Sequence, residues 1–477
     1  MYNEIQNDKI LVKCCPAPRQ IAIQTMEFYA FAHFSINTFT DREWGDGGED
    51  PKLFCPEQLN TDQWVETLRA AEIKGLILTC KHHDGFCLWP SAYTEHSVKN
   101  SPFREGKGDV VREVAEACMR GGLKFGVYLS PWDRNSPVYG QGKAYDDYFC
   151  CQLTELLTQY GEIFTVWFDG ACGEGPNGRI QQYDWDRYYA LIRELQPQAC
   201  ISICGPDVRW CGNETGDTRQ SEWSVLPTGF LGPDEVAEQS QKQDDASFRL
   251  KTIDPTNRDL GSRSFLQGAQ GYRWYPCETD VSIRPGWFYH ETEDGYVRSA
   301  DQLLDLWYRT VGGNSTLLLN IPPDRRGLLH ENDVMQLTEL GNRLRQIFSH
   351  NLAENATFAS DHDDGYHTAE ALRFDNYESY YKPFDGENAV SITVKLKTAA
   401  DVTHIVLKEH IPLSQRVERY VISVRCVDGT WLIAATGTTI GYKKVERFPK
   451  VLTDTIRIDI EDSRVCPIMS FVGIYSA

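Results

Sequence analysis

Short apolar runs alternate with amphipathic helical patterns from residue 28 to residue 348, and this alternation restricts the fold more than any other feature of the sequence. Parallel strands buried on both faces read as continuous apolar runs, and a helix between two of them forms a right-handed crossover. We predict strands at 28–39, 75–80, 124–130, 163–168, 199–204 and 315–320. Over about 345 residues we expect seven or eight such strand-helix units. That number fits an α/β (β/α)8-like barrel with insertions better than a smaller doubly wound sheet.

Helical patterns occupy the intervals between these strands. Five of these patterns lie at 61–74, 148–160, 186–195, 300–311 and 334–348. Asn60 followed by Gln63 is typical of a capping box at the start of the first helix. Asp109 predicts the start of a further helix, which ends at Gly121 and Gly122. The region 205–284 is less regular and for the most part shows no clear helix or strand pattern.

The pattern changes after Ser349. Short alternating segments follow, with turn signals such as Asp428-Gly429 between them, at 389–396, 402–408, 419–427, 431–436, 450–460 and 472–475. Alternation with a period of two and frequent turns predicts an antiparallel β-sandwich. We therefore expect two domains, a barrel over residues 1–348 and a β-sandwich over residues 349–477.

Composition narrows the possible partners. The formal net charge of -20 disfavours nucleic acid and anionic membrane surfaces, and no segment approaches the ~18 to 20 apolar residues of a membrane span. A neutral or cationic small substrate fits this charge. The 12 Trp and 23 Tyr residues fit the stacking of aromatic rings on sugars, and they fit large hydrophobic cores equally well.

The 15 cysteines show neither metal nor disulfide spacing, which favours a reducing compartment. The N-terminus, MYNEIQNDKI, lacks the basic and apolar stretches of a signal peptide. We expect a cytoplasmic protein without a cofactor. A periplasmic or secreted protein trimmed of its signal would have the same N-terminal composition.

Polar residues recur where the predicted strands end. Asp169 and Gly170 end one apolar run, His82 and His83 follow another, and His33 and Tyr128 lie near two more. The carboxyl ends of barrel strands carry the active site in such folds, so we expect these side chains to converge. Taken singly, Asp169 could open an ordinary loop, and a strand His or Tyr is more often a core residue.

His82 and His83 allow three interpretations. They could hold a metal ion, but no second cluster of His and carboxylate ligands accompanies them. They could hydrogen-bond to substrate hydroxyls, or simply pack within a loop. Their position at a strand end, like that of Asp169, favours substrate binding.

Two carboxyl groups on opposite sides of the bond are what a glycosidase requires. Asp169 is the first candidate. Glu214, in a loop with Asn213 and Gly216, is the second, and Glu222 beside Trp223 is the alternative to it. Each of these glutamates taken alone would more often be a solvated loop carboxylate.

Several segments resemble motifs of the α-L-fucosidases, glycoside hydrolase family 29. Residues 31–39, FAHFSINTF, resemble its HFGxNTF motif, although Ser35 stands where Gly is commoner. Residues 81–89, KHHDGFCLW, and residues 166–170, VWFDG, resemble two further motifs. Residues 313–327 resemble the closing barrel segment. The resemblance covers residues 28–345, with the motifs in the family's order.

The resemblance implies a retaining exo-glycosidase on a (β/α)8-like barrel with a β-sandwich behind it. It implies that Asp169 is the nucleophile. The residues that it implies for the fucose pocket are His33, His82, His83, Trp89, Tyr128 and Trp287. No metal or other cofactor is implied, and the implied partner is a fucosylated oligosaccharide or glycoconjugate.

Two segments resemble the subgroup that cleaves branched α-1,3 and α-1,4 fucosides. Residues 130–135, SPWDRN, contribute Trp132, and residues 209–214, RWCGNE, contribute Trp210 and the implied acid/base Glu214. We therefore expect hydrolysis of terminal α-1,3/1,4-linked fucose on Lewis-type glycans. The alternatives are a broad-specificity α-L-fucosidase that includes α-1,2 linkages, a non-catalytic protein that binds fucosylated glycans, and a metal-dependent barrel hydrolase.

Overall fold

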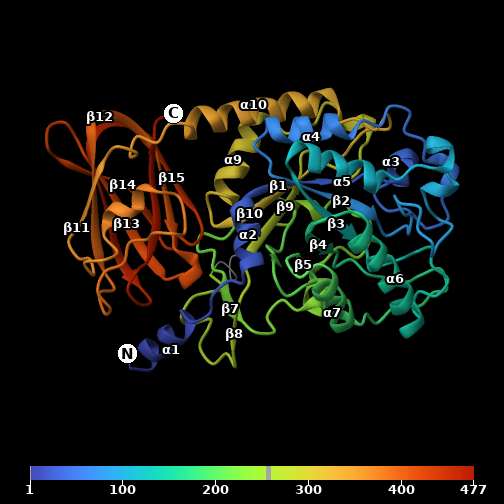
Figure 1. Cartoon of the computed structure of the whole chain (residues 1–477), viewed down its shortest axis with the longest axis horizontal. Coiled ribbons are helices and arrows are strands. Elements are labelled where there is room, and N and C mark those ends of the chain that lie inside the picture. Colours follow the sequence, from blue (N-terminus) through green and yellow to red (C-terminus); the bar gives the residue numbers. More distant parts are fainter. Residues whose placement is uncertain (1, 254–258) are drawn as a thin grey trace.

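The structure, a computed structural model, places a barrel beside a C-terminal β-rich part (Figure 1). It describes residues 2–253 and 259–477, so residue 1 and residues 254–258 of the predicted barrel domain lie outside the described residues. One sheet holds eight parallel strands: β1 Phe28–Ala32, β2 Gly75–Lys81, β3 Lys124–Leu129, β4 Ile163–Phe168, β5 Cys200–Ile203, β6 Arg209–Trp210, β9 Cys277–Ser282 and β10 Ser315–Asn320.

The order of these strands is β5-β4-β3-β2-β1-β10-β9-β6, with β5 and β6 at the two ends. A parallel bridge between Ser202 and Val208 brings the two end strands together. The sheet is therefore a nearly closed barrel, which confirms the predicted fold class. Strands β2 and β10 are buried along their whole length, as expected for strands covered on both faces.

Helices surround the barrel and supply the crossovers. Their bounds are α1 Tyr2–Leu11, α2 Pro18–Met26, α3 Ile36–Thr40, α4 Thr61–Ala70, α5 Val110–Gly121, α6 Lys143–Gln159, α7 Trp185–Leu195, α8 Pro233–Gln239, α9 Ala300–Thr310 and α10 Glu331–Phe348. Figure 1 shows α4 beside α10 at the top of the view and α6 on the side of the barrel that faces away from the C-terminal part.

The predicted helix ends are largely confirmed. Asp109 caps α5 by accepting from the Arg112 amide, and Gly122 ends it in the left-handed conformation with φ 74°. Asn60 caps α4 by accepting from the Gln63 amide at 3.1 Å. A capping box would also have the Gln63 side chain bind the backbone amide of Asn60. That part of the prediction was wrong, because the Gln63 side chain binds the backbone of Leu329 instead.

Two barrel features differ from the prediction. The first strand stops at Ala32, because the Ser35 amide bonds the Thr38 hydroxyl and α3 begins at Ile36. Strands β6 and β9 were not predicted. β6 has only two residues, and β9 carries Glu278 and Asp280, whose charges interrupt the apolar run.

The C-terminal part is an antiparallel sheet with its own buried core, consistent with the predicted β-sandwich. Its strands are β11 Thr357–Ser360, β12 Val390–Glu409, β13 Val417–Arg425, β14 Trp431–Gly437, β15 Lys444–Ser463 and β16 Met469–Tyr475. The two segments predicted at 389–396 and 402–408 are one strand, β12, with a register shift between Lys395 and Ala400. A separate small sheet pairs β7 Val225–Pro227 with β8 Tyr272–Trp274.

The C-terminal sheet supports the barrel loop that follows β6. Gln415 donates to the carbonyl of Glu222 at 3.1 Å and accepts from the Ser224 amide at 2.9 Å. Asn314, just before β10, bonds both Glu222 and the Tyr442 amide. These contacts fix the base of the segment that carries Glu214. Within residues 2–253 and 259–477, no helix combines the length and the apolar character needed to cross a membrane.

Candidate active site

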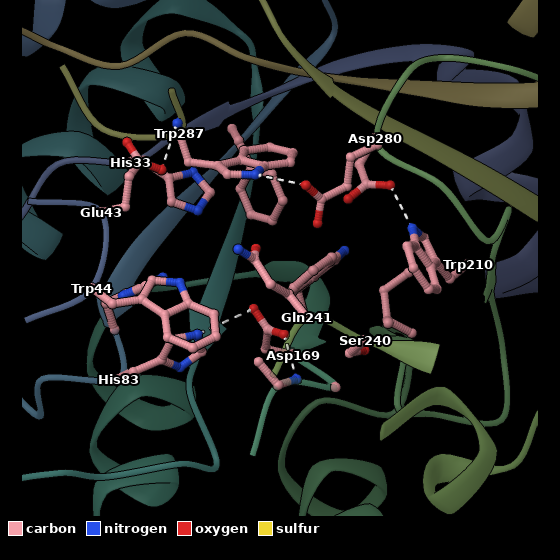
Figure 2. Close-up of a pocket in the computed structure, with 17 residues that line it drawn as sticks. His33, Glu43, Trp44, His83, Asp169, Trp210, Ser240, Gln241, Asp280 and Trp287 are labelled. Carbon is pink, nitrogen blue, oxygen red and sulfur yellow. Dashed lines mark hydrogen bonds and ion pairs between the residues drawn. The ribbon is translucent and has the colours of Figure 1, made fainter. Parts of the chain in front are cut away.

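A pocket opens at the carboxyl ends of the barrel strands, where Asp169 follows β4, His82 follows β2 and Trp210 ends β6. Figure 2 shows Asp169, Gln241 and Trp287 around the same space. The residues that line it are Phe31, His33, Glu43, Trp44, His82, His83, Trp167, Asp169, Gly170, Ala171, Ile203, Trp210, Glu214, Ser240, Gln241, Asp280 and Trp287. The predicted convergence of strand-end residues is therefore present.

Asp169 is held in one orientation by two donors. The Tyr128 hydroxyl donates to Oδ2 at 2.9 Å, and the Ala171 amide donates to Oδ1 at 2.7 Å. Burial raises the pKa of Asp169, while these two hydrogen bonds stabilise the ionised form. No arginine or lysine neutralises this carboxylate among the described residues. Asp169 therefore presents a carboxyl group in a fixed orientation to whatever occupies the pocket.

His33 and His83 present acceptor nitrogens to the pocket. His83 Nδ1 lies 2.8 Å from the Ser130 hydroxyl, which itself donates to the Trp132 carbonyl. His33 Nδ1 lies 2.8 Å from the side-chain oxygen of Asn320. In each ring Nδ1 must therefore carry the proton, and Nε2 is left as an acceptor. Such nitrogens suit substrate hydroxyl groups.

Burial keeps all three histidines neutral. It lowers the pKa of His33 to about 4 and that of His83 to about 3, and it lowers the pKa of His82 well below its usual value. The His82 ring stacks on Tyr128 with an interplanar angle of 13°, and its Nδ1 has no protein partner. In the part of the chain that the structure describes, no group of three or more His, Cys, Asp or Glu side chains could hold a metal ion.

Glu214 reaches the same pocket from the loop after β6. Trp287 donates its indole N–H to Oε2 of Glu214 at 3.1 Å. Burial, together with the negative charge of Asp169, raises the pKa of Glu214 to about 7 against the effect of that hydrogen bond. A carboxyl group that keeps its proton near neutral pH can act as a general acid.

Glu222 occupies a different environment from Glu214. Its side chain is 1% exposed, forms an ion pair with Arg209 and accepts from the Arg219 amide at 3.3 Å. It does not line the pocket. A carboxylate paired with buried guanidinium groups stabilises the loop and is a poor proton donor. Of the two glutamates, only Glu214 is therefore placed beside Asp169.

The aromatic candidates fall into three groups. Trp210 and Trp287 line the pocket, and the Trp210 indole donates to Asp280 at 2.8 Å. Tyr128 and Trp132 lie behind it: the Trp132 ring packs 5.1 Å from that of His83. Trp89 is not brought to the pocket. It is 1% exposed and donates to Glu155 of α6 at 2.8 Å, which is a core position.

Several pocket residues were not predicted. Trp44 packs over His83 and Trp132, and Glu43 accepts from the backbone amides of Trp287 and Phe288. Asp280 lies on β9, in the region left unassigned. The alternation of acidic and small residues in Cys277–Ser282 is the signal that could have revealed β9, since strands expose alternate residues to the barrel interior.

A family model and curated relatives match this chain. The model described as Alpha-L-fucosidase matches residues 22–347. "Alpha-L-fucosidase 1" of Arabidopsis thaliana is 37% identical over 492 residues, covering 99% of this chain and 91% of the relative.

Solved structures with the same overall fold also match. The crystal structure of a candidate α-L-fucosidase from Bacteroides ovatus is 44% identical, with a TM-score of 0.86 over 99% of this chain and 76% of that one. A glycoside hydrolase family 29 fucosidase from Ruminococcus gnavus, in complex with fucose, is 28% identical, with a TM-score of 0.84 over 97% and 95% of the two chains.

Proposed function

The chain belongs to the α-L-fucosidase family of glycoside hydrolases, and from this premise we propose that it removes terminal α-1,3- and α-1,4-linked fucose from branched glycans with retention of configuration. The observation that carries the proposal is that two carboxyl groups of the same pocket, those of Asp169 and Glu214, have unlike environments. Asp169 is oriented by Tyr128 and Ala171, and Glu214 has a pKa of about 7.

The first step of the proposed reaction uses the two groups together. Asp169 attacks the anomeric carbon of fucose and forms a glycosyl ester, while Glu214 donates its proton to the departing oxygen. The charge of Asp169 raises the pKa of Glu214, so the state with Asp169 ionised and Glu214 protonated is favoured.

The second step reverses the role of Glu214. Now ionised, it takes a proton from a water molecule that attacks the anomeric carbon and releases fucose, while Asp169 leaves as a carboxylate. The Nε2 atoms of His33 and His83 accept hydrogen bonds from fucose hydroxyls throughout. Trp287 packs on the sugar and keeps Glu214 in place.

The preference for branched glycans rests on the loop that carries Glu214. Trp210 and Glu214 are four residues apart and both line the pocket, so a second sugar that contacts Trp210 would also help to position Glu214. Binding energy from a remote sugar then appears in kcat/KM.

Two measurements test these proposals. Proton NMR of early hydrolysis should show α-fucose first, and early β-fucose would contradict retention. Lewis trisaccharides should be hydrolysed much faster than 2′-fucosyllactose. The opposite order would favour a broad or α-1,2-directed fucosidase and leave the fucosidase activity itself unaffected.

A further inference from the structure

A second cavity begins at Glu214 and Trp287, which line both it and the active-site pocket. Asp169 and the histidines do not reach this cavity. Its charged wall is formed by Arg249, Arg284, Arg298 and Glu293. Three guanidinium groups therefore line one cavity in a chain with a net charge of -20, together with the side chains of Glu214 and Glu293.

Arg298 is the least satisfied of these arginines. Its Nε donates to the carbonyl of Ser282 at 2.9 Å, and no carboxylate of the described residues lies within ion-pair distance of it. Burial and the nearby charge of Arg309 lower the pKa of Arg298. A partly buried, unpaired cation is costly in free energy, because desolvation is not offset by an opposite charge.

The other two arginines also retain binding capacity. Arg284 pairs with Asp333 and Asp294, but its buried Nη2 has no hydrogen-bond partner. Arg249 donates to the Pro285 carbonyl, and its guanidinium group lies 3.5 Å from a carboxylate oxygen of Glu43 and 3.9 Å from one of Asp244. Both ion-pair distances are longer than those of a strong hydrogen bond.

Glu293 does not form an ion pair with Arg298. Glu293 accepts from the Gly286 amide at 2.9 Å, and burial raises its pKa, which disfavours its charged form. Arg298 therefore remains the cation of this cavity that has no carboxylate partner among the described residues.

We propose that this cavity is a leaving-group subsite that binds a sulfate group carried by the sugar to which fucose is attached. The inference rests on the proposed function, because the leaving oxygen must lie at Glu214 and the sugar behind it must extend away from Asp169. Guanidinium groups bind carboxylate and sulfate through paired N–H donors. Without this local charge the acidic surface would repel an anionic glycan.

The test compares matched substrates. Neutral fucosylated disaccharides are compared with forms that carry one sulfate at each free hydroxyl of the leaving sugar in turn. At least one sulfated isomer should show kcat/KM about tenfold above that of the neutral substrate. Arg298→Gln should bring this ratio close to one while changing hydrolysis of the neutral substrate less than twofold.

Arg325→Gln is the matched control. Arg325 also donates through Nε to a backbone carbonyl, that of Thr38, and lies outside both cavities. This variant should retain the tenfold preference. Arg298→Lys keeps the positive charge and loses the paired N–H donors, so it should retain only part of the preference for the sulfated substrate. This variant replaces Arg298→Gln in the test if Arg298→Gln is poorly folded.

A third experiment distinguishes a sulfate group carried by the substrate from free inorganic sulfate. Inorganic sulfate should inhibit hydrolysis of the preferred sulfated substrate by the unmodified enzyme and have no effect on Arg298→Gln. The absence of a preferred sulfated isomer would overturn the proposal. The proposal would also be overturned if inorganic sulfate changed only the hydrolysis of the neutral substrate and did so only when Arg298 is present. That result would indicate a site for a free anion. If the unmodified protein did not hydrolyse neutral fucosides at all, the proposed function itself would be refuted.

Discussion

The indole nitrogen of Trp287 donates a hydrogen bond to Oε2 of Glu214 across 3.1 Å. The backbone of Trp287 is in turn held by Glu43, which accepts from the Trp287 and Phe288 amides and from His290. The proposed proton donor is therefore positioned by a side chain whose own backbone is anchored on the far side of the pocket. The hydrogen bond from Trp287 therefore both orients the Glu214 carboxyl group and influences its pKa.

Asp169→Asn should lower kcat by about 10⁴ to 10⁶-fold, as expected for loss of a catalytic nucleophile. Asn is nearly isosteric and can still accept from Tyr128, but it cannot form the glycosyl ester. Fucose binding, measured by calorimetry, should persist. Near-normal turnover by pure variant protein would contradict the assignment.

Glu214→Ala should lose activity in proportion to how much protonation the leaving group needs, up to ~10²–10⁴-fold for natural glycans. External azide should rescue turnover and give fucosyl azide, because azide attacks the ester without deprotonation. Glu222→Ala provides the contrast. It removes the partner of buried Arg209 and should cost about 3–5 kcal/mol of stability without azide rescue. Azide rescue in the Glu222 variant alone would reverse the assignment.

Activity should fall as pH rises through about 7, because Glu214 must carry its proton in the first step and has a pKa of about 7. Activity should also fall in acid, as Asp169 becomes protonated below its raised pKa. The pH dependence of kcat/KM for a natural glycan should therefore be bell-shaped.

Trp287→Phe should move the alkaline limb of that profile to higher pH. The Trp287 hydrogen bond stabilises the charged form of Glu214 and so lowers its pKa, and the variant lacks this bond. An unchanged alkaline limb would show that a group other than Glu214 controls it.

Trp210→Ala should reduce kcat/KM for Lewis trisaccharides more than for an aryl fucoside. Trp210 lines the pocket beside Asp280 and is available to a second sugar, which an aryl fucoside lacks. Equal losses on both substrates would mean that Trp210 only packs the loop.

Trp89→Phe should lower stability by about 1–3 kcal/mol and leave kcat/KM within twofold of the unmodified enzyme. The variant leaves Glu155 without its buried indole donor, far from the reacting groups. Thermal unfolding and steady-state kinetics measure the two effects. A large kinetic loss with unchanged stability would return Trp89 to the fucose pocket.

Sequence periodicity was sufficient where a strand or helix is specified by its own residues. Ile163–Phe168 is apolar except for Thr165, and Asp109 with Gly122 marks both ends of α5. Periodicity failed for β9, because the side chain of Glu278 accepts hydrogen bonds from Tyr29 and Trp167, which lie on other strands of the barrel. A charge that finds its partners through tertiary contacts reads as a loop residue in the sequence.

By itself, the sequence determined the barrel, the appended antiparallel sheet and the position of Asp169, since a continuous apolar run places its terminal residue at the barrel mouth. The residues alone left Glu214 and Glu222 open, and the family resemblance preferred Glu214. Only the tertiary structure decided their environments, because buried Arg209 pairs with Glu222 and Trp287 donates to Glu214. The same holds for Trp89, which contacts α6 and not the pocket. The environment of a side chain depends on residues distant in the chain, and that environment decides whether a carboxyl group donates a proton or closes an ion pair.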